Sequence, residues 1–168
     1  NFKIDEVYGM HNWPGVELGK FAIRSGPFFA ASDFIEATIS GKGGHAAKPH
    51  ETVDPTVIAS QIVVALQTIA SRRADPVEQV VVSITSFETS STAFNVIPQE
   101  VKIKGTVRTL DPDVRDLAEK EFLRITELTA EAMGGSADAK FTRGYPVMSN
   151  SSEQTEFAAK VARDVAGE

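Results

Sequence analysis

The order in which two hydrophobic repeats alternate constrains the fold of this 168-residue chain more than any other feature. Between Asp33 and Tyr145, segments with an apolar residue at every second position alternate with segments in which apolar residues recur every three to four positions. The first repeat is typical of strands with one covered face, and the second of helices with one buried stripe. The resulting order is strand, helix, strand, strand, helix, strand, which predicts a split βαβ arrangement.

Four strands are expected, at residues 33–40, 80–87, 101–108 and 137–145. In the first strand, Ile35, Ala37 and Ile39 alternate with polar neighbours, as a half-covered antiparallel sheet requires. The third strand alternates in the same way and places Arg108 opposite its apolar residues. The second strand begins apolar on both faces, which predicts a position in the interior of the sheet.

Each expected helix begins with an aspartate followed by proline, a capping carboxylate before a residue that favours the first helical turn. The first helix is expected from Asp54-Pro55 to about Arg73, and the second from Asp111-Pro112 to a stop at Gly134-Gly135. The predicted fold is α+β, a four-stranded antiparallel sheet with two helices on one face, known as ferredoxin-like. Because this fold hosts many unrelated functions, function must be argued from particular residues.

The two ends of the chain do not fit this unit. Residues 1–30 predict a short strand, a proline-bearing loop and a hairpin-like segment, Val16 to Arg24. Within residues 148–168, Ser151 and Gln154 form a capping-box pattern at the start of a helix. We interpret residues 31–147 as one domain inserted in a larger α/β domain, to which both flanks belong. The first residue is Asn1 and not Met, so we expect a piece of a longer polypeptide.

Composition argues against several classes of function. Without cysteine, the chain forms neither disulfides nor thiolate metal sites, which fits our expectation of a cytoplasmic location. The formal net charge of −6 argues against a nucleic-acid surface, which needs a basic face to displace counterions. No apolar run approaches the roughly 20 residues of a membrane span, so we expect no membrane partner.

A glycine-framed histidine is the first candidate for chemistry. His45 follows the first expected strand, within Gly41-Lys42-Gly43-Gly44-His45-Ala46-Ala47-Lys48-Pro49-His50. The glycines let the backbone turn sharply, and such a loop can aim an imidazole at a ligand. A polar loop residue that makes only a local hydrogen bond would give the same pattern. His50, just before the first expected helix, is more consistent with a capping or surface role.

Three further residues could contact a ligand. Arg108 is expected on the uncovered face of the sheet, where its planar fork could bind a carboxylate or simply be solvated. Asn95, before Val96-Ile97-Pro98, could bind an amide group or only shape a turn. His11 cannot form a metal site alone, because zinc or manganese needs three or more ligands. Any partner ligands of His11 would lie outside this chain.

Taken together, four motifs resemble the metal-dependent amidohydrolase branch of the aminoacylase and carboxypeptidase metallopeptidase family. That branch includes hippurate hydrolases, N-acyl-amino-acid hydrolases and indoleacetyl-amino-acid hydrolases. The motifs are Gly9-Met10-His11-Asn12-Trp13-Pro14-Gly15, the His45 loop with Asp54-Pro55, Phe94-Asn95-Val96-Ile97-Pro98, and Gly105-Thr106-Val107-Arg108-Thr109. The resemblance covers nearly the whole chain. It implies a homodimeric enzyme whose dinuclear-metal catalytic domain is interrupted by a lid domain that forms the dimer.

The resemblance also implies a role for each candidate residue. His45 matches a lid histidine that reaches across the dimer into the partner's active site and polarises the scissile carbonyl. Asn95 and Arg108 match lid residues that hold the backbone and the carboxylate of the substrate, and His11 matches a metal ligand. The implied reaction is hydrolysis of the amide bond of N-acyl amino acids or small peptides, with water activated by two divalent ions of the zinc or manganese type.

Some parts of the family pattern are absent. The sequence has no Cys-x-His pair, no Glu-Glu pair and no final histidine, which implies that this chain alone holds no metal and is inactive. Its Phe87-Glu88-Thr89-Ser90-Ser91 differs from the Phe-His-Ala-Gly of many members, so the acyl group and the amino acid stay open, as does the metal.

Two alternatives to an enzyme domain remain. One is a non-catalytic split βαβ module for interaction or dimerisation, which the pattern of helices and strands supports equally well. The other is a ferredoxin-like RNA binder, which the net charge and the lack of paired aromatic residues on the sheet oppose. An active site predicts that His45, Asn95 and Arg108 converge on one exposed patch, which a packing module does not need.

Overall fold

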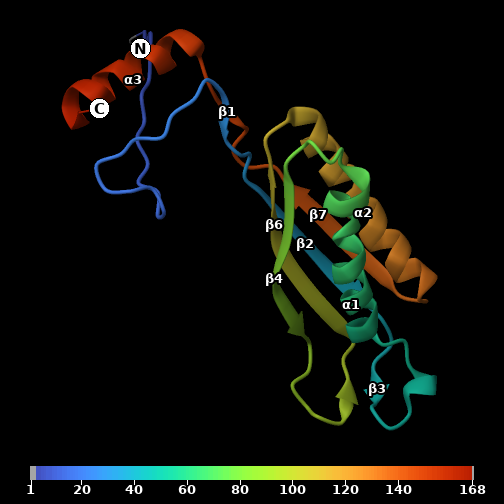
Figure 1. The fold of residues 1–168 in the computed structure, drawn as a ribbon. Helices are drawn as coiled ribbons and strands as arrows, with labels where there is room; N and C mark the ends of the chain where they lie inside the picture. Colours follow the sequence, from blue (N-terminus) through green and yellow to red (C-terminus); the bar gives the residue numbers. More distant parts are fainter. Residues whose placement is uncertain (1–2, 168) are drawn as a thin grey trace. The chain divides into compact units, whose positions relative to one another are not determined.

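The computed structural model describes residues 3–167, which divide into two compact units. The larger unit consists of residues 27–149, and the smaller one of the segments that precede and follow it. In the larger unit, one antiparallel sheet and two helices form two layers (Figure 1). The elements follow one another along the chain in the predicted order of strands and helices, so the α+β prediction is confirmed.

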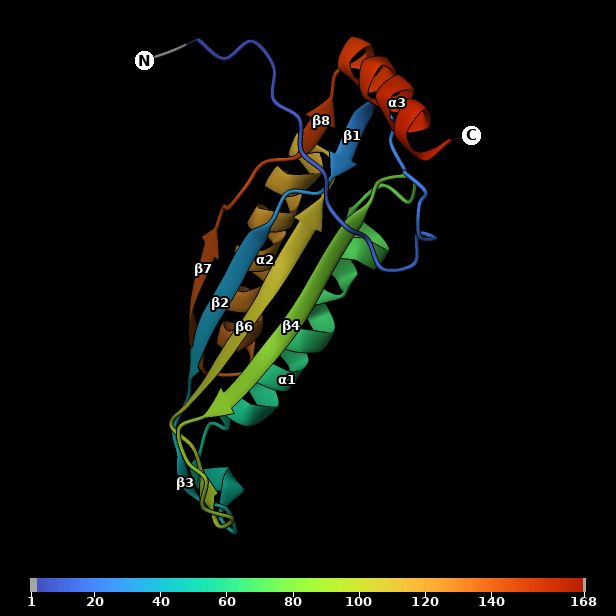
Figure 2. The ribbon, with the colours of Figure 1, turned by 90° about the vertical axis from the view of Figure 1, so that its left-hand side faces the viewer.

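The sheet consists of β2 (Asp33–Ser40), β4 (Val80–Thr89), β6 (Glu100–Thr109) and β7 (Ser136–Thr142). Their spatial order is β4-β6-β2-β7, and every neighbouring pair is antiparallel. The central strands β2 and β6 alternate between buried and accessible residues, because one face is covered and the other is open. Figure 2 shows the open face, with both helices behind the sheet.

Helices α1 (Pro55–Leu66) and α2 (Pro112–Ala132) begin where the sequence predicts. The side chain of Asp54 accepts a hydrogen bond from the amide of Thr56 at 2.8 Å, and Asp111 caps α2 in the same way. These caps satisfy amides that the first helical turn leaves unpaired. The core between helices and sheet is built mainly from Ile35, Ile39, Ile58, Ile62, Leu66, Val101, Ile103, Val107 and Phe122.

Three details of this unit differ from the prediction. Strand β4 lies at an edge of the sheet and not in its interior, and its apolar residue Val81, on the open face beside Arg108, is 52% exposed. The first helix ends at Leu66, and a short π-helical turn, η2 (Ile69–Arg73), follows it. Strand β7 ends at Thr142 and not at Tyr145, because the amide of Gly144 bonds to the side chain of Asp33 and not to a neighbouring strand.

There are also two short two-stranded sheets, one within the larger unit and one at its border. β3 (Gly44–His45) pairs with β5 (Val96–Ile97), and a 3-10 turn, η1 (Pro49–Glu51), follows β3. β1 (Gly26–Phe29) pairs with β8 (Met148–Asn150) where the chain enters and leaves the unit.

The smaller unit contains helix α3 (Ser152–Ala166) and a segment without strands. The start of α3 is predicted correctly, but the capping box is wrong, because Ser151 makes no side-chain cap and Gln154 donates to Glu6 at 2.9 Å instead. Residues 3–25 contain no strand, so the predicted strand and hairpin are wrong for this described segment. Gly19, at φ 82°, turns the chain inside the expected hairpin.

A buried ion pair joins the start of β2 to the start of α2. Asp33 is fully buried, and Arg115 donates to its two oxygens at 2.9 Å and 2.5 Å. The amide of Gly144, just beyond β7, donates to the same carboxylate at 3.0 Å. One carboxylate therefore joins three elements, and the bidentate geometry with an added amide compensates for the cost of burying its charge.

A second buried acid joins α2 to η2. Arg124 donates to both oxygens of Glu121, at 3.2 Å and 2.7 Å, and Arg73 lies 3.3 Å from the same carboxylate. The hydrogen bonds from Arg124 hold the pKa of Glu121 below its ordinary value. Glu121 is therefore a charged residue of the helical layer that is stabilised by its arginine neighbours.

The substitution Asp33→Asn is expected to destabilise the protein by about 3–5 kcal/mol, because it leaves the guanidinium of Arg115 buried without its counter-charge. Urea-induced unfolding at pH 7 measures this loss. The exposed pair Lys140–Glu36, with charged atoms 3.5 Å apart, provides the control. Lys140→Ala should cost less than about 1 kcal/mol. Equal losses for the two variants would contradict a structural role for the buried pair.

Candidate functional site

The glycine-framed histidine lies at one end of the larger unit, in an extension of the sheet that we call the tip (Figure 2). The tip consists of residues 41–53, which follow β2, and residues 90–99, which precede β6. The two segments are joined by β3 and β5, with Gly44 opposite Ile97 and His45 opposite Val96. A second connection, within the first segment, pairs Lys42 with Val53.

Close backbone contacts explain the glycines of the tip. A Cβ on Gly41 would lie 2.2 Å from the carbonyl oxygen of Val53, and one on Gly43 would lie 2.6 Å from that of Ile97. Neither glycine has a positive φ, so the expected sharp turning is not the reason for them. They are needed because a side chain would collide with the backbone of the neighbouring strand or loop.

The tip brings His45 and Asn95 together, and both residues are exposed. The amide of Ala46 donates to the carbonyl of Asn95 at 3.0 Å. The amide of Ala47 donates to Nδ1 of the His45 ring at 3.1 Å, and the amide of Lys48 donates to the His45 carbonyl at 2.8 Å. The first of these amides therefore joins the His45 loop to Asn95, and the next two bond to His45 itself.

Arg108 lies at the opposite end of the sheet. A strand advances about 3.3 Å per residue, so Arg108 lies roughly 26 Å along β6 from Glu100, where the tip meets the strand. Arg108 is on the open face as predicted, and its guanidinium donates to Thr106 Oγ1 and, at 3.0 Å, to the carbonyl of Val107. The expectation that His45, Asn95 and Arg108 form one patch is therefore wrong within a single chain.

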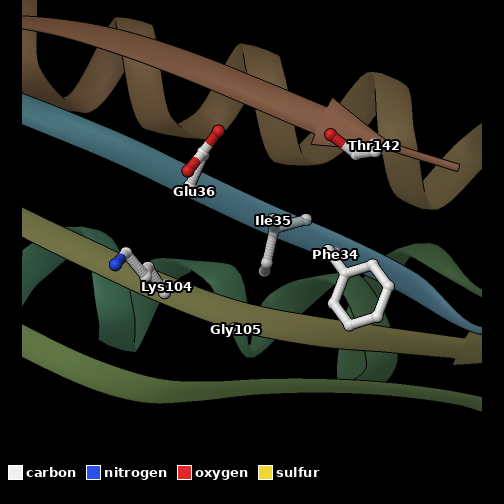
Figure 3. Close-up of a pocket in the computed structure, with 6 residues that line it drawn as sticks. All are labelled: Phe34, Ile35, Glu36, Lys104, Gly105 and Thr142. Atoms are coloured by element: carbon white, nitrogen blue, oxygen red, sulfur yellow. The ribbon is translucent and has the colours of Figure 1, made fainter.

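The open face also carries a shallow hollow of about 330 Å³ (Figure 3). Its lining residues are Phe34, Ile35, Glu36, Lys104, Gly105 and Thr142. Figure 3 shows the Phe34 ring over β6, with Glu36 and Lys104 further along the same face. Glu36 and Lys104 are direct cross-strand partners, so their charges balance across the two central strands. The hollow is a mainly apolar surface that lacks the histidine and asparagine of the tip.

His11 lies in the smaller unit. Its Nδ1 is 2.5 Å from the carbonyl of Asn12, and its ring centre is 5.9 Å from that of Trp13. A carbonyl can only accept, so Nδ1 donates in this contact. Among residues 3–167, no group of three or more His, Cys, Asp or Glu side chains could hold a metal ion. These residues alone do not fit a metal centre.

Two features of the tip were not predicted from the sequence. Phe94, next to Asn95, is fully exposed, and an apolar residue within a polar loop was an available signal for it. The amide of Ala47 acts on the imidazole through the backbone. Since every residue except proline carries such an amide, no sequence signal could have identified it.

Residues 32–132 match the family model of the peptidase dimerisation domain. The chain belongs to this family, the dimerisation domain of M20 peptidases, as the resemblance implied. No helix among the described residues has the length and apolar character needed to cross a membrane.

Curated relatives extend this similarity beyond the matched domain. The chain is 44% identical to an N-acyl-L-amino acid amidohydrolase of Geobacillus stearothermophilus, over 89% of this chain and 40% of that protein. It is 42% identical to an N-acetyl-L-cysteine deacetylase of Bacillus subtilis, over 88% of this chain and 35% of that protein. Against a hippurate hydrolase of Campylobacter jejuni, the identity is 38%, over 99% of this chain and 43% of that protein. The chain therefore spans less than half the length of these relatives.

A solved structure supports the same fold. The Bacillus subtilis YXEP protein, described as a dinuclear metal-binding peptidase of the M20 family, has a TM-score of 0.68 and 29% identity to this chain. The similarity covers 92% of this chain and 37% of that protein.

The substitution Gly43→Ala is expected to break the β3–β5 pairing, because its Cβ would meet the backbone oxygen of Ile97. Gly44→Ala is the matched control, since a Cβ there meets only a side-chain methyl of Thr52, at 2.8 Å, and no backbone atom. Hydrogen exchange of the Ala46 amide measures the result. Protection should be lost in Gly43→Ala and kept in Gly44→Ala. Equal protection in both variants would refute the close-contact explanation.

Proposed function

We propose that this chain is the lid and dimerisation domain, with flanking pieces of the catalytic domain, of a metal-dependent amidohydrolase. The complete enzyme would cleave the amide bond of N-acyl amino acids or small peptides. The observation that carries the proposal is the tip, where a rigid backbone presents His45 and Asn95 side by side. The names of the amidohydrolase, deacetylase and hippurate hydrolase relatives support the same reaction class.

The separation between the tip and Arg108 supports an active site shared by two subunits. A substrate of amino-acid size cannot contact two points that are roughly 26 Å apart on one sheet. In a two-fold dimer, however, the tip of one subunit can approach the Arg108 end of its partner. We therefore propose that His45 and Asn95 act in the partner's active site.

Each of the three residues then has a distinct task. His45 donates a hydrogen bond to the oxygen on which negative charge develops, a contribution of roughly 3–4 kcal/mol in comparable sites. Asn95 offers both a donor and an acceptor to the substrate amide. Arg108 binds the free carboxylate through its planar fork and so fixes the orientation of the substrate.

The metal centre would lie mainly outside this chain. We propose His11 as one ligand of two divalent ions of the zinc or manganese type, whose chemistry is the activation of water. The other ligands would come from the rest of the catalytic domain, and the chain alone is expected to be inactive. The cytoplasmic location likewise stays a prediction.

Exposed apolar residues support the assignment of the flanks to a larger domain. In the smaller unit, Leu18, Val7 and Met10 are almost fully exposed, and α3 buries none of its residues. Apolar surface of this extent is typical of a domain that lacks its packing partner. We propose residues 1–30 and 148–168 as flanks of the catalytic domain and residues 31–147 as the lid.

The surface formed by α1 and β4 is the proposed dimer interface. The exposed positions of α1 carry Val57, Ser60, Gln61 and Val64 and no charge, whereas those of α2 are mostly charged. Strand β4 lies along α1 at the edge of the sheet, and its outer backbone groups have no strand partner among the described residues (Figure 2). An apolar helix beside an open strand edge is a surface that a second copy can cover.

The substitution Val64→Lys is expected to weaken the dimer by at least tenfold in Kd, because it buries a charge in an apolar contact. Val64 is 66% exposed in one chain, so the fold should tolerate the change. Leu128→Lys on α2, where Leu128 is 50% exposed, is the matched control and should leave the dimer intact. Analytical ultracentrifugation measures both. Dissociation by Leu128→Lys alone would move the interface to α2.

A shared site predicts complementation between two inactive variants of the full-length enzyme. His45→Ala and Arg108→Ala should each lower kcat/KM of the homodimer by about 100-fold or more. Mixing them after reversible dissociation should restore about a quarter of wild-type turnover, because half of the dimers are mixed and each mixed dimer has one intact site. Turnover of a hippurate-like substrate measures the recovery. Full activity of His45→Ala, or mixtures as inactive as their parents, would contradict the proposed sharing.

A further inference from the structure

We infer that His45 works as a neutral imidazole with its proton on Nε2, and that the backbone amide of Ala47 holds the ring in this tautomer. The tautomer itself follows from the geometry of this chain. Its use as a hydrogen-bond donor to the substrate rests on the proposed function. Ala47 is thereby a positioning residue that acts through its backbone and not through its side chain.

The hydrogen bond to Nδ1 determines where the proton is. The amide nitrogen of Ala47 lies 3.1 Å from Nδ1 of His45. A backbone amide can only donate, so Nδ1 must accept with its lone pair. A neutral imidazole has one proton, which must then be on Nε2. Protonation of Nδ1 would place two N–H groups against each other and remove this hydrogen bond.

The surrounding backbone keeps this amide in place. The neighbouring amides are both occupied, that of Ala46 by the carbonyl of Asn95 and that of Lys48 by the carbonyl of His45. The pairing of His45 with Val96 fixes the strand on which the ring is mounted. The amide of Ala47 is therefore presented to the ring by a loop that is hydrogen-bonded on both sides.

The same geometry separates two possible roles of the imidazole. With Nδ1 occupied by Ala47 and Nε2 protonated, the ring has no lone pair with which to take a proton. It can therefore donate a hydrogen bond to a developing oxyanion, whereas action as a general base would first require the loss of the Ala47 contact. Among the described residues, the hydrogen bond from the Ala47 amide to Nδ1 is the one that the His45 ring makes.

Nuclear magnetic resonance of this chain, labelled with ¹⁵N at histidine and alanine, tests the tautomer without any assay of activity. At a pH where the ring is neutral, the nitrogen shifts should identify Nε2 as protonated and Nδ1 as unprotonated. A scalar coupling across the hydrogen bond should link Nδ1 to the amide of Ala47. His45→Gln assigns the signals, and the exposed His50 provides an internal reference. A protonated Nδ1, or an even mixture of tautomers, would overturn the inference.

Two substitutions at Ala47 then test the positioning role. Ala47→Gly keeps the amide proton and should preserve the tautomer and the coupling, whereas Ala47→Pro removes the donor. In Ala47→Pro, the coupling should vanish and the tautomers should mix, while protection of the Ala46 amide reports whether the tip is still formed. If the tip is lost in Ala47→Pro, the test is the scalar coupling between the Ala47 amide and Nδ1 of His45. This coupling should be present both in the wild type and in Ala47→Gly, and its absence would overturn the inference.

In the full-length enzyme, Ala47→Pro should lower kcat about tenfold with little change in KM, while Ala47→Gly should match the wild type. Unchanged kcat in Ala47→Pro with an intact tip would overturn the positioning role. The proposed function is tested by a different measurement, the turnover of His45→Ala. Full activity of that variant would contradict the proposed function but would leave the tautomer of His45 unchanged.

Discussion

Asp33 is the residue on which both the fold and the proposed substrate site depend. Its side chain joins the start of β2 to α2 through Arg115 and to the end of β7 through Gly144. Its backbone carbonyl accepts a hydrogen bond from Thr106 Oγ1 at 2.8 Å, and the same hydroxyl accepts one from Arg108. The residue that anchors the helical layer on one face of the sheet therefore also supports the arginine on the other face.

The part of the fold that the sequence predicted well is local. Asp54-Pro55 and Asp111-Pro112 act on amides of the next turn, and the alternation of β2 and β6 reflects a single covered face. The position of β4 could not be derived in this way. Apolar residues such as Val81 show that both faces of a strand are apolar, but they do not show whether the strand lies at the centre or at an edge of the sheet.

The candidate site was predictable only in part. The motifs placed His45 and Asn95 in two loops, and the pairing of β3 with β5 brings these loops together at one end of the sheet. Strand periodicity also placed Arg108 on the open face, but periodicity specifies a face and not an end. The pair Asp33–Arg115 spans 82 positions of sequence, and no local pattern connects its members. Long-range partners of this kind become visible only once the strands are ordered in space.

The construction of the tip from main-chain contacts has an evolutionary consequence. The groups that place the imidazole are carbonyls and amides of residues 46–48, 95 and 97, together with glycines that leave room for them. Side chains on the outer surface of the same loops, such as the exposed Phe94, take no part in this framework. These outer residues can therefore be exchanged while the imidazole, to which we assign the reaction, keeps its place.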